Sequence, residues 1–98
     1  LEHHYAPTHP LIFAAMNFEN YDRNEIGIIS LQKEYPGIPP EKQHILSPTG
    51  DLNEAAQKIF SAMRALDTTD IKVIFAEHFP DTGLGRAIND RLRRASVS

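Results

Sequence analysis

The chain has 98 residues, of which 41% are hydrophobic and 23% charged, with a formal net charge of -3 and no cysteine. This length allows one domain with a modest core, because roughly two-thirds of the unfolded chain's surface can be buried at this size. The lack of cysteine excludes disulfides, thiolate nucleophiles and sulfur-ligated zinc, and no apolar run approaches the ~20 residues that cross a bilayer. We therefore expect a soluble, cytoplasmic domain without a membrane partner.

The first ten residues differ from the rest of the chain. Residues 1–10 are rich in histidine and proline and show no apolar period, which predicts the tail of an inter-domain linker, with the domain itself in residues 11–98. The chain starts at Leu1 rather than a methionine and shows no signal-peptide pattern. We expect it to be part of a longer polypeptide.

Strands are predicted at residues 11–14, 26–31, 43–47 and 71–76, where short apolar runs are bounded by turn-forming residues. The segment 15–25 is slightly short for a parallel crossover, so it could hold a loop or one helical turn. The relative direction of the first two strands stays open. Four prolines and glycines in residues 32–42 rule out a regular helix there.

Two stripes of apolar residues at helical spacing predict two helices. Asp51 followed by Glu54 resembles a capping box, and the helix that it opens has apolar residues on one face through Leu66. The second helix begins near Leu84, after the strand at 71–76. The order from residue 43 onward is that of a βαβα unit with a parallel pair, which favours a three-layer, Rossmann-like α/β domain with a mainly parallel sheet of about four strands.

A corner between the last strand and the last helix is a candidate ligand-binding or domain-contact site, since ligands of open α/β sheets gather beyond the carboxyl ends of the strands. Its candidate residues are Glu77, Thr82, Gly83, Gly85 and Arg86. The third glycine of a dinucleotide fingerprint is missing, Asp81 would repel a phosphate, and Thr82 suits a helix N-cap. These features favour a structural turn, with a small nucleotide-binding domain as the alternative.

The last helix is basic at its far end, where Arg91, Arg93 and Arg94 complement the negative end of the helix dipole. Contact with tRNA phosphates is the alternative hypothesis, although no interleaved aromatic residues accompany the arginines. The spacing of Arg86, Asp90 and Arg94 also permits ion pairs along the helix.

No self-contained active site can be assembled from the sequence. The five histidines lack the i, i+4 spacing of a helical zinc pair, so no metal site is predicted. Ser30 and Ser47 stand at strand ends without a nucleophile-elbow signature, and Glu77 and Asp81 have no evident partner base. We assign no catalytic residue and no cofactor to this chain.

Motifs at both ends and in the middle resemble one family. They are HYAP at residues 4–7 before PLI at 10–12, the helix pattern of residues 50–67 followed by Ile74, Ala76 and Glu77, and GLGRAINDRLRRA at residues 83–95. In this order and separation the chain resembles, over nearly its whole length, the C-terminal domain of the two-domain form of threonylcarbamoyl-AMP synthase. It departs from the family between its first two strands, where residues 17–25 leave little room for the usual helix.

The resemblance implies an accessory and regulatory domain. The family makes threonylcarbamoyl-adenylate from L-threonine, bicarbonate and ATP, with magnesium, for the threonylcarbamoyladenosine modification of tRNA. The chemistry belongs to a preceding YrdC-like catalytic domain in the same chain, so the 98 residues are not expected to be catalytic alone. The resemblance also implies that His4, Tyr5 and Pro7 belong to a flap that folds over the nucleotide site of that domain.

Overall fold

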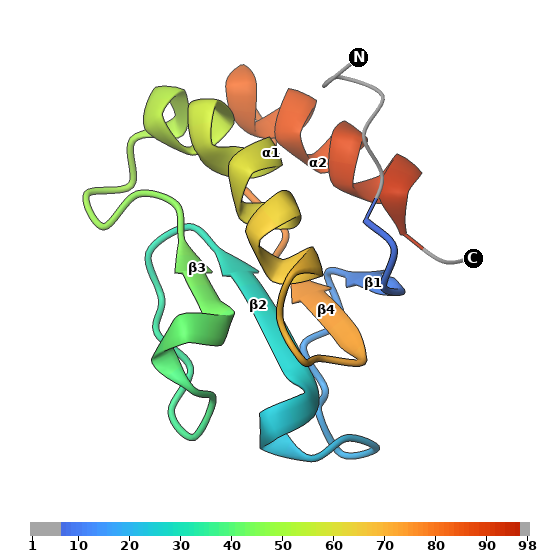
Figure 1. Cartoon of the computed structure of the whole chain (residues 1–98). Helices are drawn as coiled ribbons and strands as arrows, with labels where there is room; N and C mark the ends of the chain where they lie inside the picture. The colour runs from blue at the N-terminus through green and yellow to red at the C-terminus, as the bar shows by residue number, and fades with distance from the viewer. Residues whose placement is uncertain (1–6, 97–98) are drawn as a thin grey trace.

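The computed structural model describes residues 7–96 (Figure 1). Its strands are β1 (Leu11–Phe13), β2 (Ile26–Ser30), β3 (Gln43–Ile45) and β4 (Val73–Ala76), and its α-helices are α1 (Leu52–Asp67) and α2 (Leu84–Ala95). Two single-turn 3-10 helices, η2 (Arg23–Glu25) and η3 (Pro40–Lys42), lead into β2 and β3. All four predicted strands and both predicted helices are present, and each strand is one or two residues shorter than expected.

The four strands form one parallel sheet in the order β1-β4-β2-β3. The direction of the first two strands is thereby settled, because β1 and β2 each pair in parallel with β4, which lies between them. The strands β3 and β4 of the βαβα unit are parallel as expected, and the strand order, which the sequence left open, places β2 between them.

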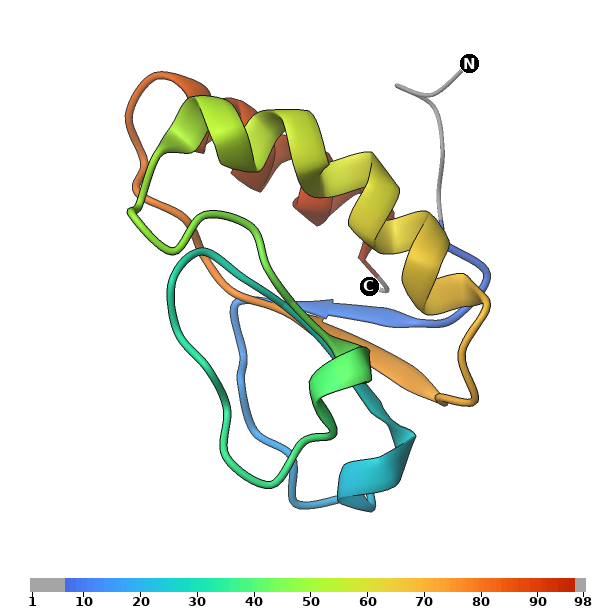
Figure 2. The same ribbon diagram turned by 60° about the vertical axis from the view of Figure 1, so that its left-hand side comes forward.

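Both α-helices cover the same face of the sheet and pack against each other (Figure 2). Alternate strand residues such as Leu11, Ile29 and Ile74 point into this layer, where they meet Met63 of α1 and Leu92 of α2. Each of these side chains is fully buried. The apolar stripes that predicted the helices are therefore the surfaces that close the main core.

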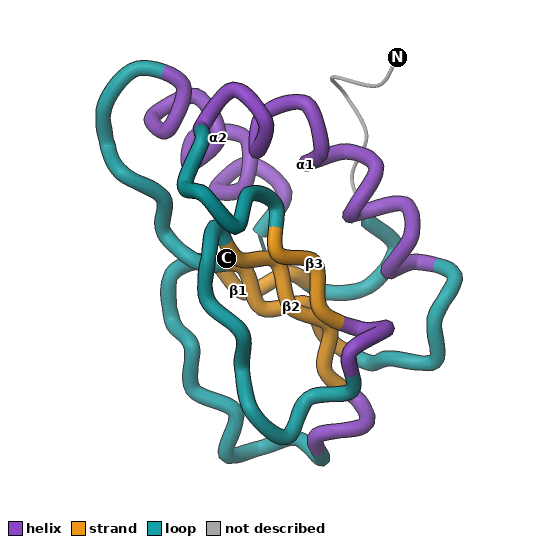
Figure 3. Tube along the Cα trace, turned by 90° about the vertical axis from the view of Figure 1, so that its left-hand side faces the viewer, coloured by secondary structure: helices purple, strands orange, loops and turns teal. Residues whose placement is uncertain are grey.

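Loops cover the opposite face of the sheet, as the loop segments of Figure 3 show. Phe75 of β4 is at the centre of the contacts on this face, with the rings of Phe18 and Tyr21 set edge-on to it at centroid distances of 4.9 and 5.9 Å. Tyr35, from the loop after β2, packs edge-on to Phe18. Within residues 7–96 the third layer thus consists of irregular backbone with no α-helix, which explains how residues 14–25 connect β1 to β2 in so few residues.

The start of α1 is capped by Asp51, whose carboxylate accepts hydrogen bonds from the backbone N–H groups of Asn53 and Glu54. The backbone N–H of Asp51 donates to Ser47 Oγ at 2.8 Å rather than to Glu54. The predicted N-cap is confirmed. In the expected capping box the Glu54 side chain would accept a hydrogen bond from the Asp51 N–H, and the buried Ser47 hydroxyl accepts this bond instead.

Candidate functional site

The corner predicted from the glycines lies where β4 ends and α2 begins. Gly83 is the N-cap residue of α2, with a φ of 53° that favours glycine, and no side-chain cap is present. The expectation that Thr82 caps the helix is therefore wrong. A glycine that turns the chain one residue later leaves the exposed Thr82 outside the helix.

Gly85 is required because α2 approaches the preceding loop very closely. A Cβ at this position would lie 1.8 Å from the carbonyl oxygen of Pro80. One helical turn further on, Asn89 Oδ1 accepts from the backbone N–H of Phe79 at 2.7 Å, and Asn89 Nδ2 donates to the Phe79 carbonyl at 2.9 Å. The close approach that Gly85 allows is thus made by the chain's own backbone, which supports the structural interpretation of the corner.

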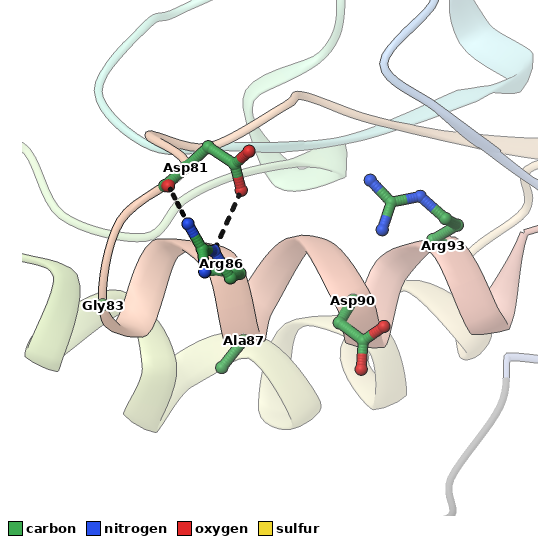
Figure 4. A pocket seen from close by; sticks show the side chains of 6 residues that line it. All are labelled: Asp81, Gly83, Arg86, Ala87, Asp90 and Arg93. Atoms are coloured by element: carbon green, nitrogen blue, oxygen red, sulfur yellow. Dashed lines mark hydrogen bonds and ion pairs between the residues drawn. The ribbon is translucent and has the colours of Figure 1, made fainter.

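The outer side of α2 forms an open depression lined by charged residues of both signs (Figure 4). Arg86 leans over Asp81, with its Nε 3.8 Å from the carboxylate and its Nη2 donating to the Asp81 carbonyl at 3.4 Å. Asp90 and Arg93 lie further along the helix. Because Asp81 and Asp90 balance the two arginines, the depression has no net positive charge to attract a phosphate.

Glu77 is half-buried at the carboxyl end of β4 and joins three segments of the chain. Its carboxylate accepts from the backbone N–H of Leu31 at 3.0 Å and from the Tyr35 hydroxyl, while its own N–H donates to the carbonyl of Ile29. Burial, together with the hydrogen bond and the negative charge of Glu77, raises the pKa of Tyr35. Glu77 therefore holds the loop after β2 against the sheet, and both carboxylate oxygens are used within the domain.

The arginines at the end of α2 contact the domain itself. The Arg91 guanidinium lies over the ring of Phe60 in α1 at 4.9 Å, and that of Arg93 lies over Phe13 at the end of β1 at 5.4 Å. Arg94 pairs with Asp90 one turn earlier at 2.9 Å, which is one of the predicted pairs, whereas Arg86 pairs with Asp81 instead. These contacts attach α2 to its neighbours, and contact with tRNA stays untested.

Among residues 7–96 no group of three or more His, Asp or Glu side chains is placed to hold a metal ion. The hydroxyl of Ser30 donates to the carbonyl of Lys33, and Ser47 Oγ accepts from the Asp51 N–H, so both buried serines serve the fold. His44 is half-buried, and burial lowers its pKa. In the same range no helix is long and apolar enough to cross a membrane.

The N-terminal segment reveals a site that the sequence did not predict. His4 and Tyr5 lie outside the described residues, and Pro7 is half-buried at their edge. Directly after Pro7, the backbone N–H of Thr8 donates to both carboxylate oxygens of Asp67 at 3.1 and 3.2 Å, and the Thr8 hydroxyl donates at 3.2 Å. His9 Nδ1 lies 3.0 Å from the same carboxylate. We call this set of contacts the Asp67 anchor.

The Asp67 anchor and the predicted corner lie in different parts of the domain. The Asp67 anchor precedes β4 in the chain, whereas Glu77 and the Gly83 corner follow it, so they lie toward opposite ends of that strand. The only local signal for the anchor was an acid at the end of a predicted helix. Its partners lie 58 and 59 residues away, beyond the reach of any local pattern.

The comparisons with known proteins agree with this fold. Residues 1–97 match the family described as "Threonylcarbamoyl-AMP synthase, C-terminal domain". The threonylcarbamoyl-AMP synthase of Bacillus subtilis (strain 168) is 28% identical over 102 aligned residues, which cover 95% of this chain. That of Pyrococcus abyssi (strain GE5 / Orsay) is 44% identical over 45 residues, or 46% of this chain.

A solved structure gives the same result. The crystal structure of P. abyssi Sua5 complexed with L-threonine superposes with a TM-score of 0.71 and 27% identity over 95% of this chain. The chain spans only 30% of the Bacillus protein and 29% of the solved chain. The shorter alignment with the Pyrococcus sequence covers 13% of that protein. With a family match over nearly all of its residues and the parallel four-stranded architecture in common, the chain belongs to the family of threonylcarbamoyl-AMP synthase C-terminal domains.

Proposed function

We propose that this chain is the accessory domain of a threonylcarbamoyl-AMP synthase and that it acts by docking to a YrdC-like catalytic domain earlier in the same polypeptide. The reaction joins L-threonine, bicarbonate and ATP into threonylcarbamoyl-adenylate, in the cytoplasm, for the modification of tRNA. ATP and its magnesium bind the catalytic domain. The domain described here holds the segment that covers the nucleotide.

The observation that carries this proposal is the match of residues 1–97 to a C-terminal domain family whose members continue well beyond the length of this chain. The contacts support a non-catalytic role. Glu77, Arg86 and Asn89 are all used in hydrogen bonds or ion pairs within the domain. A segment such as HYAP, closing over an adenylate, would exclude water from an intermediate that water destroys.

The proposal is tested by removing the domain in stages. Three proteins are compared for adenylate formation: the complete polypeptide, one that ends at the residue aligned with Pro10, and one that ends before Leu1. Both truncations should lower activity, because the flap loses its support in the first and is absent in the second. Full activity in the protein that ends before Leu1 would rule out the accessory role.

A nucleotide site at the Gly83 corner has less support, because the carbonyl of Pro80 fills the space beside Gly85. Titration of the 98-residue chain with ATP, followed by amide chemical shifts, tests it directly. Shift changes confined to Gly83, Gly85 and Arg86 would favour that site. A tRNA contact through Arg91, Arg93 and Arg94 would instead show an affinity that falls steeply with salt.

A further inference from the structure

The strand β3 leaves one side of its backbone without a partner strand. It is an edge strand, with β2 on its inner side and, within residues 7–96, no strand on its outer side (Figure 1). The backbone N–H of Leu46 donates to the carbonyl of Ser30 at 2.9 Å, so the backbone groups of Leu46 point toward β2. Because adjacent residues of a strand direct their backbone groups to opposite sides, those of Gln43 and Ile45 point outward.

Three of these outward groups form no hydrogen bond with any other part of the chain that the structure describes. They are the carbonyl of Gln43 and both the N–H and the carbonyl of Ile45, whereas the N–H of Gln43 donates to the carbonyl of Pro40. An unpaired row of this kind is a template for another strand. A strand added in either direction can bond to all three groups.

The edge also lacks the charged side chains that commonly protect edge strands. Residues 43–45 are glutamine, histidine and isoleucine, and burial lowers the pKa of His44, which keeps its imidazole neutral at neutral pH. Lys42 precedes the strand, but its ammonium group donates to the carbonyls of Asn24 and Asp70, which precede β2 and β4. The charge of Lys42 is therefore directed toward the inner strands and away from the open edge.

A groove lies between β3 and α1 on the helix face of the sheet. It has a volume of about 360 Å³ and is lined by β3, by Leu46 and by Lys58, Ser61 and Ala62 of α1. Of these lining residues Lys58 alone is charged, and its side chain is 53% exposed. It pairs with Glu54 at 2.8 Å, and its ammonium group has two further protons to donate. An acidic side chain that enters the groove therefore finds a cationic donor.

A second depression lies on the opposite, loop face of β3. Its volume is about 200 Å³, and it is lined by Glu34, Pro40, Gln43 and Ile45. The Gln43 amide is already bonded to the backbone of the loop after β2, which leaves the apolar surfaces of Pro40 and Ile45 for a visiting side chain. Because successive side chains of a strand point to opposite faces, a strand beside β3 would direct alternate side chains into the two depressions.

We propose that β3 receives an extended segment of another polypeptide, which adds to the sheet as a further strand, with acidic side chains toward Lys58 and apolar side chains toward Pro40 and Ile45. The three open backbone groups of Gln43 and Ile45 hold its main chain. The two depressions select for alternating acidic and apolar residues. This binding site is separate from the accessory role and does not depend on it.

The test uses the 98-residue chain and a short synthetic peptide of alternating valine and glutamate with blocked ends. The peptide is titrated to millimolar concentration, because three backbone groups give only a weak affinity. Amide chemical shifts of residues 43–46 should change. At about 90% occupancy the Ile45 amide should exchange its hydrogen about tenfold more slowly, since only the free fraction exchanges. No change at Ile45 would overturn the proposal.

Two control peptides separate strand addition from other modes of binding. The first has the same side chains with methyl groups on its backbone nitrogens, so it has no N–H to donate and should not bind. The second has lysine in place of glutamate and should bind on the order of tenfold more weakly, because it brings a like charge to Lys58. Equal binding of the methylated peptide would refute strand addition, and equal binding of the lysine peptide would refute the acidic preference.

Substitutions in the domain test the same contacts from the other side. Lys58→Glu should weaken binding of the valine–glutamate peptide on the order of tenfold. Lys72→Glu makes the same change of charge at a 71% exposed lysine just before β4, so it is the matched control and should leave the affinity unchanged. Equal affinity of Lys58→Glu and the unchanged chain would contradict the proposal.

Ile45→Pro tests the backbone pairing directly. It removes the outward N–H without removing a hydrogen bond to β2, since proline is tolerated on an edge strand, and it should abolish binding. Retained binding would overturn strand addition. Should Ile45→Pro fail to fold, the methylated peptide and Lys58→Glu decide the question.

A second copy of this chain is the alternative occupant of the edge. Sedimentation and hydrogen exchange of the chain alone, over a range of protein concentrations, distinguish it. We expect a monomer whose Ile45 amide exchanges at a rate independent of concentration. Self-association that protects Ile45 in the absence of peptide would identify the second copy as the occupant and overturn the proposal.

Discussion

The side-chain amide of Asn89 forms two hydrogen bonds with the backbone of a single residue, Phe79. Its Oδ1 accepts from the Phe79 N–H at 2.7 Å and its Nδ2 donates to the Phe79 carbonyl at 2.9 Å. Both residues are almost fully buried, at 1% and 0% exposure. The relationship fixes α2 to the loop that follows β4, and with Gly85 it explains the sequence GLGRAIND as a packing motif.

Asn89→Ala should lower the free energy of unfolding by about 2–4 kcal/mol, because two buried backbone groups lose their partners. Urea denaturation at neutral pH measures the change. Gln57→Ala, on the exposed side of α1, is the control and should change stability by less than about 0.5 kcal/mol. A loss of similar size in both variants would contradict the role assigned to Asn89.

The two glycines of the corner should respond differently to alanine. Gly85→Ala places a methyl group against the Pro80 carbonyl and should cost about 3 kcal/mol or more, since backbone has to move. Gly83→Ala meets nothing within 4 Å, so its cost of about 1–3 kcal/mol should come only from the backbone, whose φ of 53° with a ψ of -127° lies outside the left-handed α region. Thermal unfolding of the two variants ranks them, and the reverse order would contradict the packing motif.

Tyr35 should make the domain less stable at alkaline pH. Its pKa is raised in the folded state, so above a pH of about 10 the unfolded chain releases a proton that the folded chain retains. The free energy of unfolding should therefore be constant below that pH and fall as the pH rises beyond it.

Denaturation at a series of pH values checks this expectation. Tyr35→Phe should flatten the alkaline decline, although it loses the hydrogen bond to Glu77 at neutral pH. Tyr21→Phe is the matched control. It removes a tyrosine hydroxyl from the same loop layer and keeps the ring that packs on Phe75. An alkaline decline of equal slope in Tyr35→Phe and the unchanged protein would refute the assignment.

Arg91 and Phe60 should be energetically coupled, since the guanidinium lies over the ring and joins α2 to α1. A double-mutant cycle with Arg91→Ala and Phe60→Ala should give a coupling of about 0.5–1 kcal/mol. Arg94→Ala with Phe60→Ala is the comparison, because Arg94 pairs with Asp90 instead and should show no coupling to the ring. A coupling of zero for Arg91 would leave that arginine available for another partner.

Sequence alone predicted the elements because their causes are local. The stripe of α1, the Asp51 cap and the glycines before α2 each act within a few residues, and all are found in the structure. The Rossmann-like parallel sheet followed from buried apolar runs of strand length.

Other features depend on residues far apart in the chain. The pairing of Leu11 with Ile74 joins residues from the two ends of the domain, and no local pattern encodes it. The rings of Phe18, Tyr21 and Tyr35 pack on one face of the sheet at irregular spacing, so no period revealed them. Asp67 was visible as part of a motif, while its partners Thr8 and His9 became known only from the structure.

The strand order has a consequence for synthesis and folding. Within residues 7–96, the first strand, β1, is an edge strand whose sole neighbour in the sheet is β4, the last of the four strands to be made. While the chain grows, residues 11–13 have no strand beside them until residue 76 has been added. Thr8 and His9 likewise cannot form their hydrogen bonds until Asp67 has been synthesised. Such distant pairings are slow to form. The apolar first strand is therefore exposed longest during synthesis, and a substitution that delays β4 should increase aggregation through residues 11–13 before it affects the mature fold.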